Sequence, residues 1–284
     1  MSRRTFGFAV LGLALALGAC APQQSALLGQ AVPADIHIPP YARRPYQPFS
    51  RNAAVQIALR EWRAFGSPIV HPGEELPYDA ERADGLWQRV GDYWWQGLGM
   101  GTPDQGITGM HDQNGFVFPA DQDGNYAWSA VFIDYVMRMA GAGSRFPYSP
   151  LHADYINAAK EEALGERHDL AIVAEPPENY APRVGDLVCM WRGNRPIHYA
   201  DLPAGPFPGH CDIVVATHPG SIDGIGGNVA NTVGMWQIPT TADGRLVNPD
   251  GMAVDPNHPW FVVLRVNYDV DGPIVSPFAP SPVS

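Results

Sequence analysis

The sequence has few cysteines and no recognisable metal-binding motif. Only three cysteines, Cys20, Cys189 and Cys211, occur in 284 residues, and no two of them form a Cys-x-x-Cys pair. The nine histidines are scattered along the chain, without a His-Glu-x-x-His motif. Zinc centres usually need ligands clustered in such motifs. We therefore expect no metal and no cofactor.

Basic residues are also scarce. There are 18 lysines and arginines against 29 aspartates and glutamates, which gives a formal net charge of −11. Proteins that bind nucleic acid or anionic lipid surfaces usually carry an excess of positive charge. The balance argues against a nucleic-acid partner and favours a neutral or basic one.

Long hydrophobic runs are absent except near the N-terminus. Two arginines precede an apolar run from Phe6 to Leu17, which is too short to span a membrane and is typical of a secretory signal. The run ends in Leu-Gly-Ala-Cys20, which resembles the bacterial lipobox, where the signal is cleaved before a cysteine that is then lipidated. An ordinary signal peptide with an incidental cysteine is the alternative. The residue after Cys20 is Ala21 and not aspartate, and this favours transport of the lipoprotein to the outer membrane over retention at the inner one.

These features predict a cell-envelope protein that is lipid-anchored through Cys20, with residues 1–20 as the signal peptide. Residues 21–48 are rich in proline, glutamine and alanine and lack a sustained apolar period, so we expect a tether. Residues 273–284 form a proline-rich tail that we expect to be disordered. The intervening residues 49–272 are numerous enough for one sizeable core.

Apolar residues recur at helical spacing in the first half of the domain. Ser50 is a suitable N-cap for a helix from Arg51 to Phe65. Further helices are predicted over 80–99, 125–141 and 150–165. Strand patterns follow over residues 185–193, 210–220, 221–229, 231–238 and 261–270. Helices followed by an antiparallel sheet predict an α+β fold.

The segment between the second and third helices is a long loop rich in glycine and aspartate. Its last residues, Asp121 to Asn125 ("DQDGN"), have the alternating oxygen ligands of a calcium loop. They lack the glycine at the sixth position and the final glutamate that such a loop requires. We therefore expect an Asx-type turn that caps the following helix.

Four motifs occur in an informative order. Trp128 and Ser129 begin a helix ("WSAVFI"), "GDLV" begins a strand, Gly-His210 opens the next strand, and "GGN" ends the following one at Asn228. This order resembles the papain-like cell-wall hydrolases of the CHAP and NlpC type, in which a cysteine nucleophile begins the helix. Over roughly residues 50 to 270 the chain is most similar to domain of unknown function 2272, an uncharacterised bacterial family with serine at this place.

The resemblance implies a papain-like core of N-terminal helices packed on an antiparallel sheet. It assigns Ser129 as the nucleophile, His210 as the general base and Asn228 as the residue that orients the imidazole. The substrate implied is the peptidoglycan stem peptide or its amide bond to the glycan. Three neighbours of the serine are candidate substrate-binding residues: Asn125, Tyr126 and Trp128.

Serine at position 129 departs from the CHAP and NlpC pattern. A cysteine can be held as a thiolate by a nearby imidazolium and a helix N-terminus, whereas a serine must lose its proton during the attack. Two interpretations follow. The protein is a peptidoglycan amidase or endopeptidase that uses a Ser-His-Asn arrangement, or it is a catalytically inactive module of the same fold that binds cell wall or protein.

The two remaining cysteines suggest a disulfide, as expected for an exported protein. If the strands of Cys189 and Cys211 are antiparallel neighbours, their Cα atoms can lie roughly 4.5 to 5.5 Å apart, which a disulfide can bridge. Cys211 cannot replace the missing nucleophile, because adjacent strand residues such as His210 and Cys211 point to opposite faces of the sheet.

Overall fold

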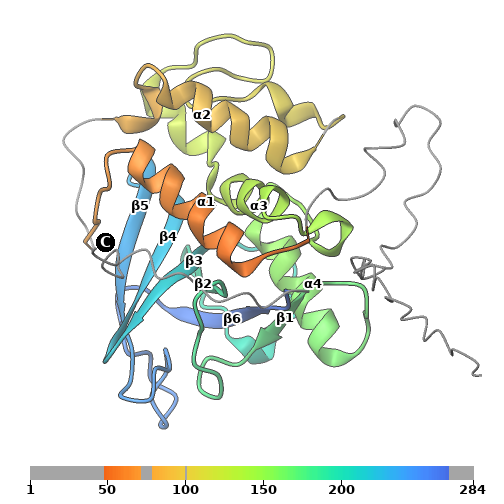
Figure 1. The fold of residues 1–284 in the computed structure, drawn as a ribbon, viewed down its shortest axis with the longest axis vertical. Helices are drawn as coiled ribbons and strands as arrows, with labels where there is room; N and C mark the ends of the chain where they lie inside the picture. The colour runs from red at the N-terminus through yellow and green to blue at the C-terminus, as the bar shows by residue number, and fades with distance from the viewer. Residues whose placement is uncertain (1–47, 72–78, 100, 269–284) are drawn as a thin grey trace, which may run out of the picture. The chain divides into compact units, whose positions relative to one another are not determined.

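The computed structural model describes residues 48–71, 79–99 and 101–268. The predicted signal peptide with Cys20, nearly all of the predicted tether, and the predicted tail lie outside the described residues. The described chain has the expected α+β architecture, with N-terminal helices packed against a six-stranded antiparallel sheet (Figure 1). None of the helices in this part of the chain is long and apolar enough to cross a bilayer.

The predicted helices form with shorter bounds. Helix α1 (Arg51–Ala64) starts where expected, since the Ser50 hydroxyl accepts a hydrogen bond from the Ala53 N–H at 3.3 Å. Helix α2 (Leu86–Asp92) continues directly into the π-helical turn η3 (Tyr93–Gly97). Helices α3 (Ser129–Met139) and α4 (His152–Leu164) follow the long loop. Short 3-10 turns lie at Ala80–Arg82 (η2), Pro103–Gly106 (η4), Ala120–Tyr126 (η5), Gly143–Arg145 (η6) and Tyr199–Asp201 (η7).

The sheet has the strand order β1-β6-β2-β3-β4-β5, and every neighbouring pair is antiparallel. Five of the strands were predicted, whereas the four-residue edge strand β1 was not. The strands are β1 (Ile172–Glu175), β2 (Leu187–Trp191), β3 (Gly209–His218), β4 (Ser221–Val229), β5 (Thr232–Pro239) and β6 (Trp260–Val266).

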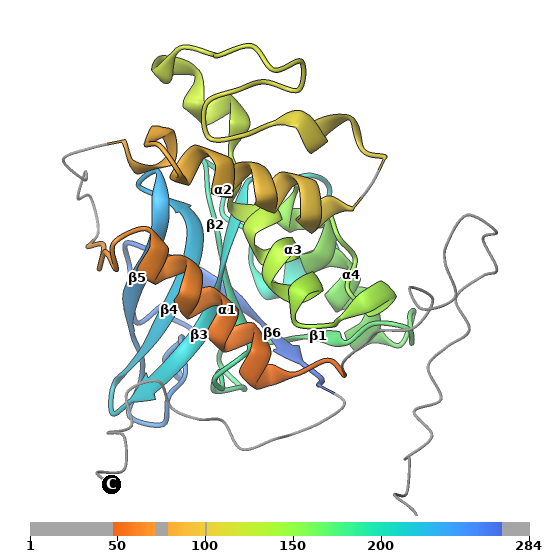
Figure 2. The same cartoon turned by 45° about the horizontal axis from the view of Figure 1, so that its top comes forward.

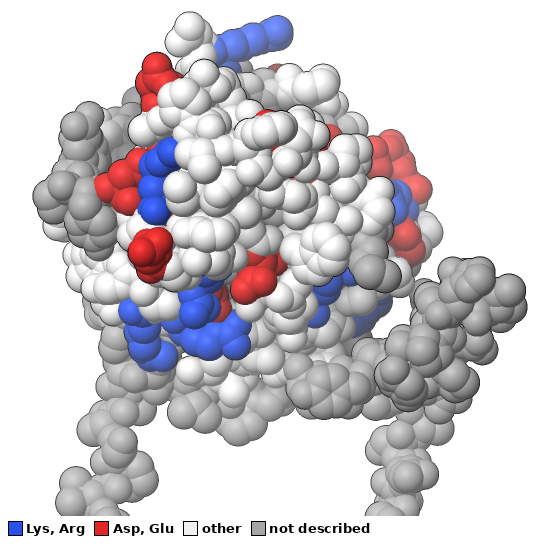
Figure 3. All heavy atoms as spheres, turned by 90° about the horizontal axis from the view of Figure 1, so that it is seen from above, with Lys and Arg blue, Asp and Glu red and all other residues white. Residues whose placement is uncertain are grey.

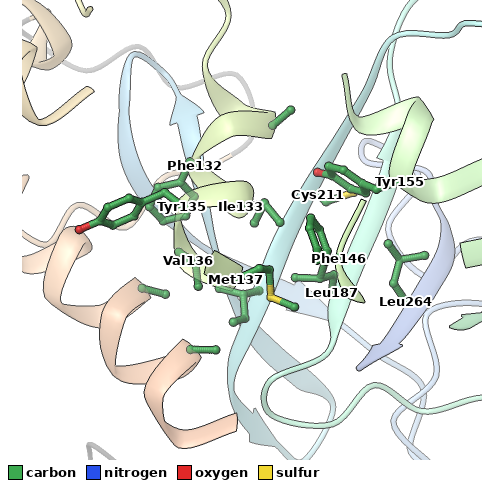
Figure 4. Packing of buried hydrophobic residues seen from close by; sticks show 14 of the residues in the cluster. Phe132, Ile133, Tyr135, Val136, Met137, Phe146, Tyr155, Leu187, Cys211 and Leu264 are labelled. Atoms are coloured by element: carbon green, nitrogen blue, oxygen red, sulfur yellow. The ribbon is translucent and has the colours of Figure 1, made fainter. Parts of the chain in front are cut away.

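Helix α3 is the centre of the main core. Helices α1, α3 and α4 lie on one side of the sheet (Figure 2), and α3 contacts α1, η3, β3 and β4. Its residues from Ser129 to Met137 are all buried, including Asp134, whose pKa is raised well above its ordinary value by burial. Figure 4 shows α3 side chains packed with Leu187 and Cys211 of the sheet. A helix buried on every side holds its first residue in a fixed position.

Strands β2 and β3 are joined by a disulfide. Cys189 and Cys211 are paired in the register, and their Cα atoms are 4.1 Å apart. Both cysteines belong to the core on the helical side of the sheet. Because strand residues alternate between faces, this orientation places His210 and Asp212 on the opposite side.

The opposite side of the sheet has a smaller core of its own. It contains Val188, Met190, Val214, Ile222, Ile238, Leu246, Trp260 and Val263. Met190 is the register partner of His210, and Val214 follows Asp212 by two residues, so these four side chains share one face. The side that carries no helix therefore contains a polar His-Asp group next to apolar residues.

The expected Asx cap before α3 is wrong. Residues 120–126 form the 3-10 turn η5, and the N-cap residue of α3 is Trp128, which makes no side-chain cap hydrogen bond. The Asp123 carboxylate instead accepts a hydrogen bond from Arg82 at 2.5 Å. Asp123, one of the residues expected to cap α3, therefore ties the loop to Arg82 of η2.

Charged side chains are spread over the surface. On the face drawn in Figure 3, basic and acidic side chains lie in small groups separated by uncharged residues. The net negative charge of the chain is therefore not gathered into one acidic patch on this face.

Candidate active site

Two helix N-termini bring a serine and a histidine together. Ser129 is the first residue of α3 and His152 is the first residue of α4, and the Ser129 Oγ lies 2.7 Å from the His152 Nε2. The other ring nitrogen, Nδ1, is hydrogen-bonded to the hydroxyl of Tyr155, one turn further along α4. Residues three apart on a helix share a face, so Tyr155 fixes the orientation of the imidazole.

The protonation states suit a general base. Burial, and secondarily the charges of His210 and Arg192, hold the pKa of His152 well below its ordinary value, so the ring is neutral. Burial also raises the pKa of Tyr155, which keeps its hydroxyl neutral. When Nδ1–H donates to Tyr155, the Nε2 lone pair accepts the Ser129 hydroxyl, and this tautomer is the one that a general base needs.

The start of α3 offers hydrogen-bond donors beside the serine. The first backbone hydrogen bond of the helix runs from the Phe132 N–H to the Trp128 carbonyl at 3.0 Å. The N–H groups of Ser129 and Ala130 precede it and have no acceptor within the helix. Such donors at a helix N-terminus can stabilise the negative charge of an oxyanion.

The expected contact between Ser129 and His210 is absent. The His210 Nε2 lies 2.8 Å from the Asp212 Oδ1, and the Nδ1 has no hydrogen-bond partner among the described residues. The reason is strand alternation, because Cys211 points to the helical side and its neighbour His210 points away. The two histidine rings nevertheless lie close, with centroids 5.5 Å apart. His152, which the sequence analysis did not single out, takes the place expected for His210.

Asn228 does not orient either histidine. Its backbone is left-handed with φ of 53°, and it lies near the end of β4, where the register with β5 shifts between Gly226 and Val229; Ala230 and Asn231 in the turn that follows are also left-handed. Asparagine tolerates this conformation better than most residues. No hydrogen bond joins Asn228 to His210 in the described part of the chain. Asp212 is the partner of His210 instead.

Glycines of β4 make room for these groups. A Cβ atom on Gly226 would lie 1.9 Å from the Asp212 Oδ1 and 2.7 Å from the His210 Nε2. On the other face, a Cβ on Gly227 would lie 2.5 Å from the Phe132 Cβ of α3. The "GGN" motif therefore serves close packing on both sides of the sheet.

Comparison with known proteins gives one match. Residues 81–266 match the family described as uncharacterized protein conserved in bacteria (DUF2272). The chain belongs to this family. No curated protein and no solved structure matches it. The matched residues contain Ser129, His152, His210 and Asp212, so the whole polar group lies within the DUF2272 domain.

The burial of Trp128 in the DUF2272 domain argues against the substrate-binding role expected for it. Its side chain is only 1% exposed, and its indole N–H donates to the Glu81 carboxylate. The ring packs against Phe65 and Tyr93 at centroid distances of 6.0 and 5.7 Å. Trp128 is thus a core residue that fixes the start of α3, and it has no free face on which a ligand could stack.

The other two candidates lie on η5. Tyr126 is half-buried, and its ring stacks on Phe118 with centroids 4.1 Å apart, whereas Asn125 is exposed. Neither residue is hydrogen-bonded to Ser129 or His152 in the described part of the chain. Their part in substrate binding stays a prediction.

Three acidic side chains gather near the indole of Trp128, and one of them, Glu81, accepts its N–H hydrogen bond. Oxygen atoms of Asp79, Glu81 and Asp123 lie within 4.8 Å of one another, and among the described residues this is the group whose spacing could hold a metal ion. Arg82 supplies positive charge there through its bond to Asp123. Burial, with the nearby carboxylates, raises the pKa of Glu81 to about 8, so Glu81 is mostly protonated at neutral pH. Only the fold brings these three residues together, and the sequence analysis missed them.

Proposed function

We propose that the protein is an exported lipoprotein that hydrolyses amide bonds of peptidoglycan stem peptides, with Ser129 as the nucleophile and His152 as the general base. The observation that carries this proposal is the 2.7 Å hydrogen bond between the Ser129 Oγ and the His152 Nε2 at the N-terminus of α3. A nucleophile and a base at this distance, with the base held by a third group, is the arrangement of serine hydrolases.

The reaction follows from the geometry. The His152 Nε2 removes the Ser129 hydroxyl proton as the Oγ attacks the amide carbon, and the N–H groups that begin α3 receive the developing oxyanion. His152 then gives this proton to the leaving nitrogen, and the C–N bond breaks to leave an acyl-serine ester. His152 next deprotonates a water molecule that attacks the ester, which frees the carboxylic acid and restores the serine. Tyr155 holds the ring throughout.

The proposed substrate and the proposed location are argued from the sequence. The order of motifs resembles that of papain-like CHAP and NlpC hydrolases, whose substrate is the cell wall. The lipobox-like segment ending at Cys20 supports a lipid anchor at the outer membrane, with the domain facing peptidoglycan in the periplasm. One element departs from that pattern, because the base of this site comes from α4 and not from the strand that carries His210.

Burial of the site favours a second candidate function. Ser129 is 6% exposed and His152 is 5% exposed, so a substrate reaches them only if neighbouring groups move. A domain that binds cell-wall peptide without cleaving it needs no such opening. This inactive module is the alternative to the hydrolase.

Digestion of purified peptidoglycan by two histidine variants tests the assignment of the base. We expect His152→Ala to lose at least about 100-fold in the release of soluble fragments, since general-base catalysis typically contributes that much. His210→Ala is the matched control and should keep more activity, because His210 does not contact Ser129. Loss of activity in His210→Ala with a fully active His152→Ala would contradict the assignment. Far-UV circular dichroism must show that both variants are folded.

A further inference from the structure

A cavity lies on the side of the sheet that carries no helix. Its volume is about 410 Å³, which is within the range of small-molecule sites. It is lined by Met190, Trp191, Arg192, Gly193, Trp236, Asn257, His258 and Pro259. These residues come from the end of β2, from β5 and from the segment before β6, and none of them belongs to the Ser129 site.

The buried His210–Asp212 pair lies on the same face of the sheet as this cavity. Asp212 packs against Gly226 and Gly224, and the register partner of Gly224 on β5 is the cavity residue Trp236. Met190, the register partner of His210, lines the cavity on the other side. Both side chains of the pair are fully buried, and the His210 Nδ1 and the Asp212 Oδ2 have no hydrogen-bond partner among the described residues.

The polar groups around the cavity are mostly hydrogen-bond donors. Arg192 is exposed at the rim of the cavity, and its side chain forms no hydrogen bond or ion pair with any described residue, although the chain has an excess of acids. The Trp236 indole N–H is buried and has no hydrogen-bond partner in the part of the chain that the structure describes. The indole ring contacts His258 edge-on at a centroid distance of 4.4 Å, and Asp255 holds the other side of that imidazole at 2.8 Å. A cavity with an unpaired guanidinium and a free indole N–H is suited to an acceptor with negative charge.

The nearest acid does not neutralise Arg192. Burial raises the pKa of Asp212 to about 8, and burial lowers the pKa of His210. Burial thus favours the uncharged form of both members of the pair. The positive charge of Arg192 remains available to a ligand.

We propose that this cavity is a second ligand site, which binds the carboxylate of a small peptide through Arg192, with the peptide body against Trp236 and Met190. A guanidinium can bind a carboxylate through two parallel hydrogen bonds, and the indole N–H adds a third donor. The site goes beyond the proposed hydrolase and does not depend on the chemistry of Ser129.

Titration calorimetry with acetyl-alanyl-alanine tests the proposal. The dipeptide with a free carboxylate should bind, and the same dipeptide with a C-terminal amide should bind at least about tenfold more weakly, because it lacks the charge-assisted hydrogen bonds. Arg192→Gln should lose the same factor. Arg195→Gln, an exposed arginine outside the cavity, is the matched control and should bind like the natural protein. Ser129→Ala should also bind normally, which separates this site from the hydrolase.

Three results would overturn the proposal. They are equal binding of the acid and the amide, equal binding by the Arg192 and Arg195 variants, and no detectable binding of the dipeptide by the natural protein. Inorganic phosphate is the second probe. Binding of phosphate that depends on Arg192, without binding of the dipeptide, would replace carboxylate by phosphate as the recognised group and so refute the carboxylate assignment.

Discussion

At the scale of single residues, burial decides which groups carry charge. Glu81 is 3% exposed and keeps its carboxyl near two other acids, with the Trp128 indole as its donor. Its pKa in the fold is about 8, above the ordinary 4.5. The folded protein therefore retains a proton that the unfolded chain releases over this interval. The contribution of Glu81 to the stability of the fold therefore falls as the pH rises from about 4.5 to about 8.

This linkage predicts the behaviour of Glu81→Gln. Glutamine still accepts the bond from Trp128 and never ionises, so the variant should lose less stability than the natural protein between pH 5 and pH 8.5. Urea denaturation at both pH values measures the difference. The exposed Glu166→Gln is the control and should follow the natural protein. Identical pH dependence in Glu81→Gln and the natural protein would show that Glu81 is ionised in the fold.

Single residues also explain why the sequence pointed to His210 and not to His152 as the partner of Ser129. The sequence pointed to Ser129 because it follows Trp128 at the start of a predicted helix, where the CHAP and NlpC pattern has a cysteine. It did not identify His152, because the angle at which α4 meets α3 is a tertiary feature. One local signal was available, namely His152 and Tyr155 three residues apart on one helical face. The faces of β3 were also readable, since a disulfide through Cys211 on the helical side turns His210 away.

At the scale of elements, the spacing of apolar residues predicted most of the helices and strands. Helices α1, α3 and α4 and strands β2 to β6 were all expected, because their apolar residues recur at helical or strand spacing over many residues. Strand β1 was missed because four residues are too few to show a strand pattern. It is recognisable as a strand only through its pairing with β6. The Asx cap was wrong because Arg82, far away in sequence, binds Asp123.

The disulfide between β2 and β3 gives a prediction at this scale. It closes a loop with a sequence separation of 22 residues, so its removal should lower the free energy of unfolding by about 3 kcal/mol. The variant is Cys189→Ala with Cys211→Ala, and chemical denaturation measures the loss. The natural protein treated with a reductant is the control and should lose a similar amount. Unchanged stability in both would mean that the bridge does not constrain the unfolded chain.

At the scale of the whole molecule, the proposed lipid anchor at Cys20 would determine where the domain works. We predict that Cys20→Ser shifts the protein from the detergent phase to the soluble phase when cells are fractionated with a phase-separating detergent, because several acyl chains bind a membrane much more tightly than a bare chain does. Cys189→Ala with Cys211→Ala retains Cys20 and is the control. Equal partitioning of Cys20→Ser and the natural protein would exclude lipidation at this residue.

The domain itself unites two polar sites on opposite sides of one sheet. Ser129 and His152 lie among the helices, and His210 and Asp212 lie on the side of the cavity. The closely spaced histidine rings are the point where the two sides approach each other. Because the sites differ in their residues, variants can separate hydrolysis from the binding of a carboxylate.

The central claim is that Ser129 is a nucleophile, and the most direct measurement is the release of soluble fragments from purified peptidoglycan by the natural protein, Ser129→Ala and Ser129→Cys. The account predicts that the natural protein releases fragments and that Ser129→Ala loses at least about a thousandfold while it binds insoluble peptidoglycan as before, since the hydroxyl acts in the transition state. An inert natural protein with an active Ser129→Cys would show a thiol site that has been silenced. If all three proteins are inert and bind peptidoglycan equally, the claim is contradicted and the domain is a binding module.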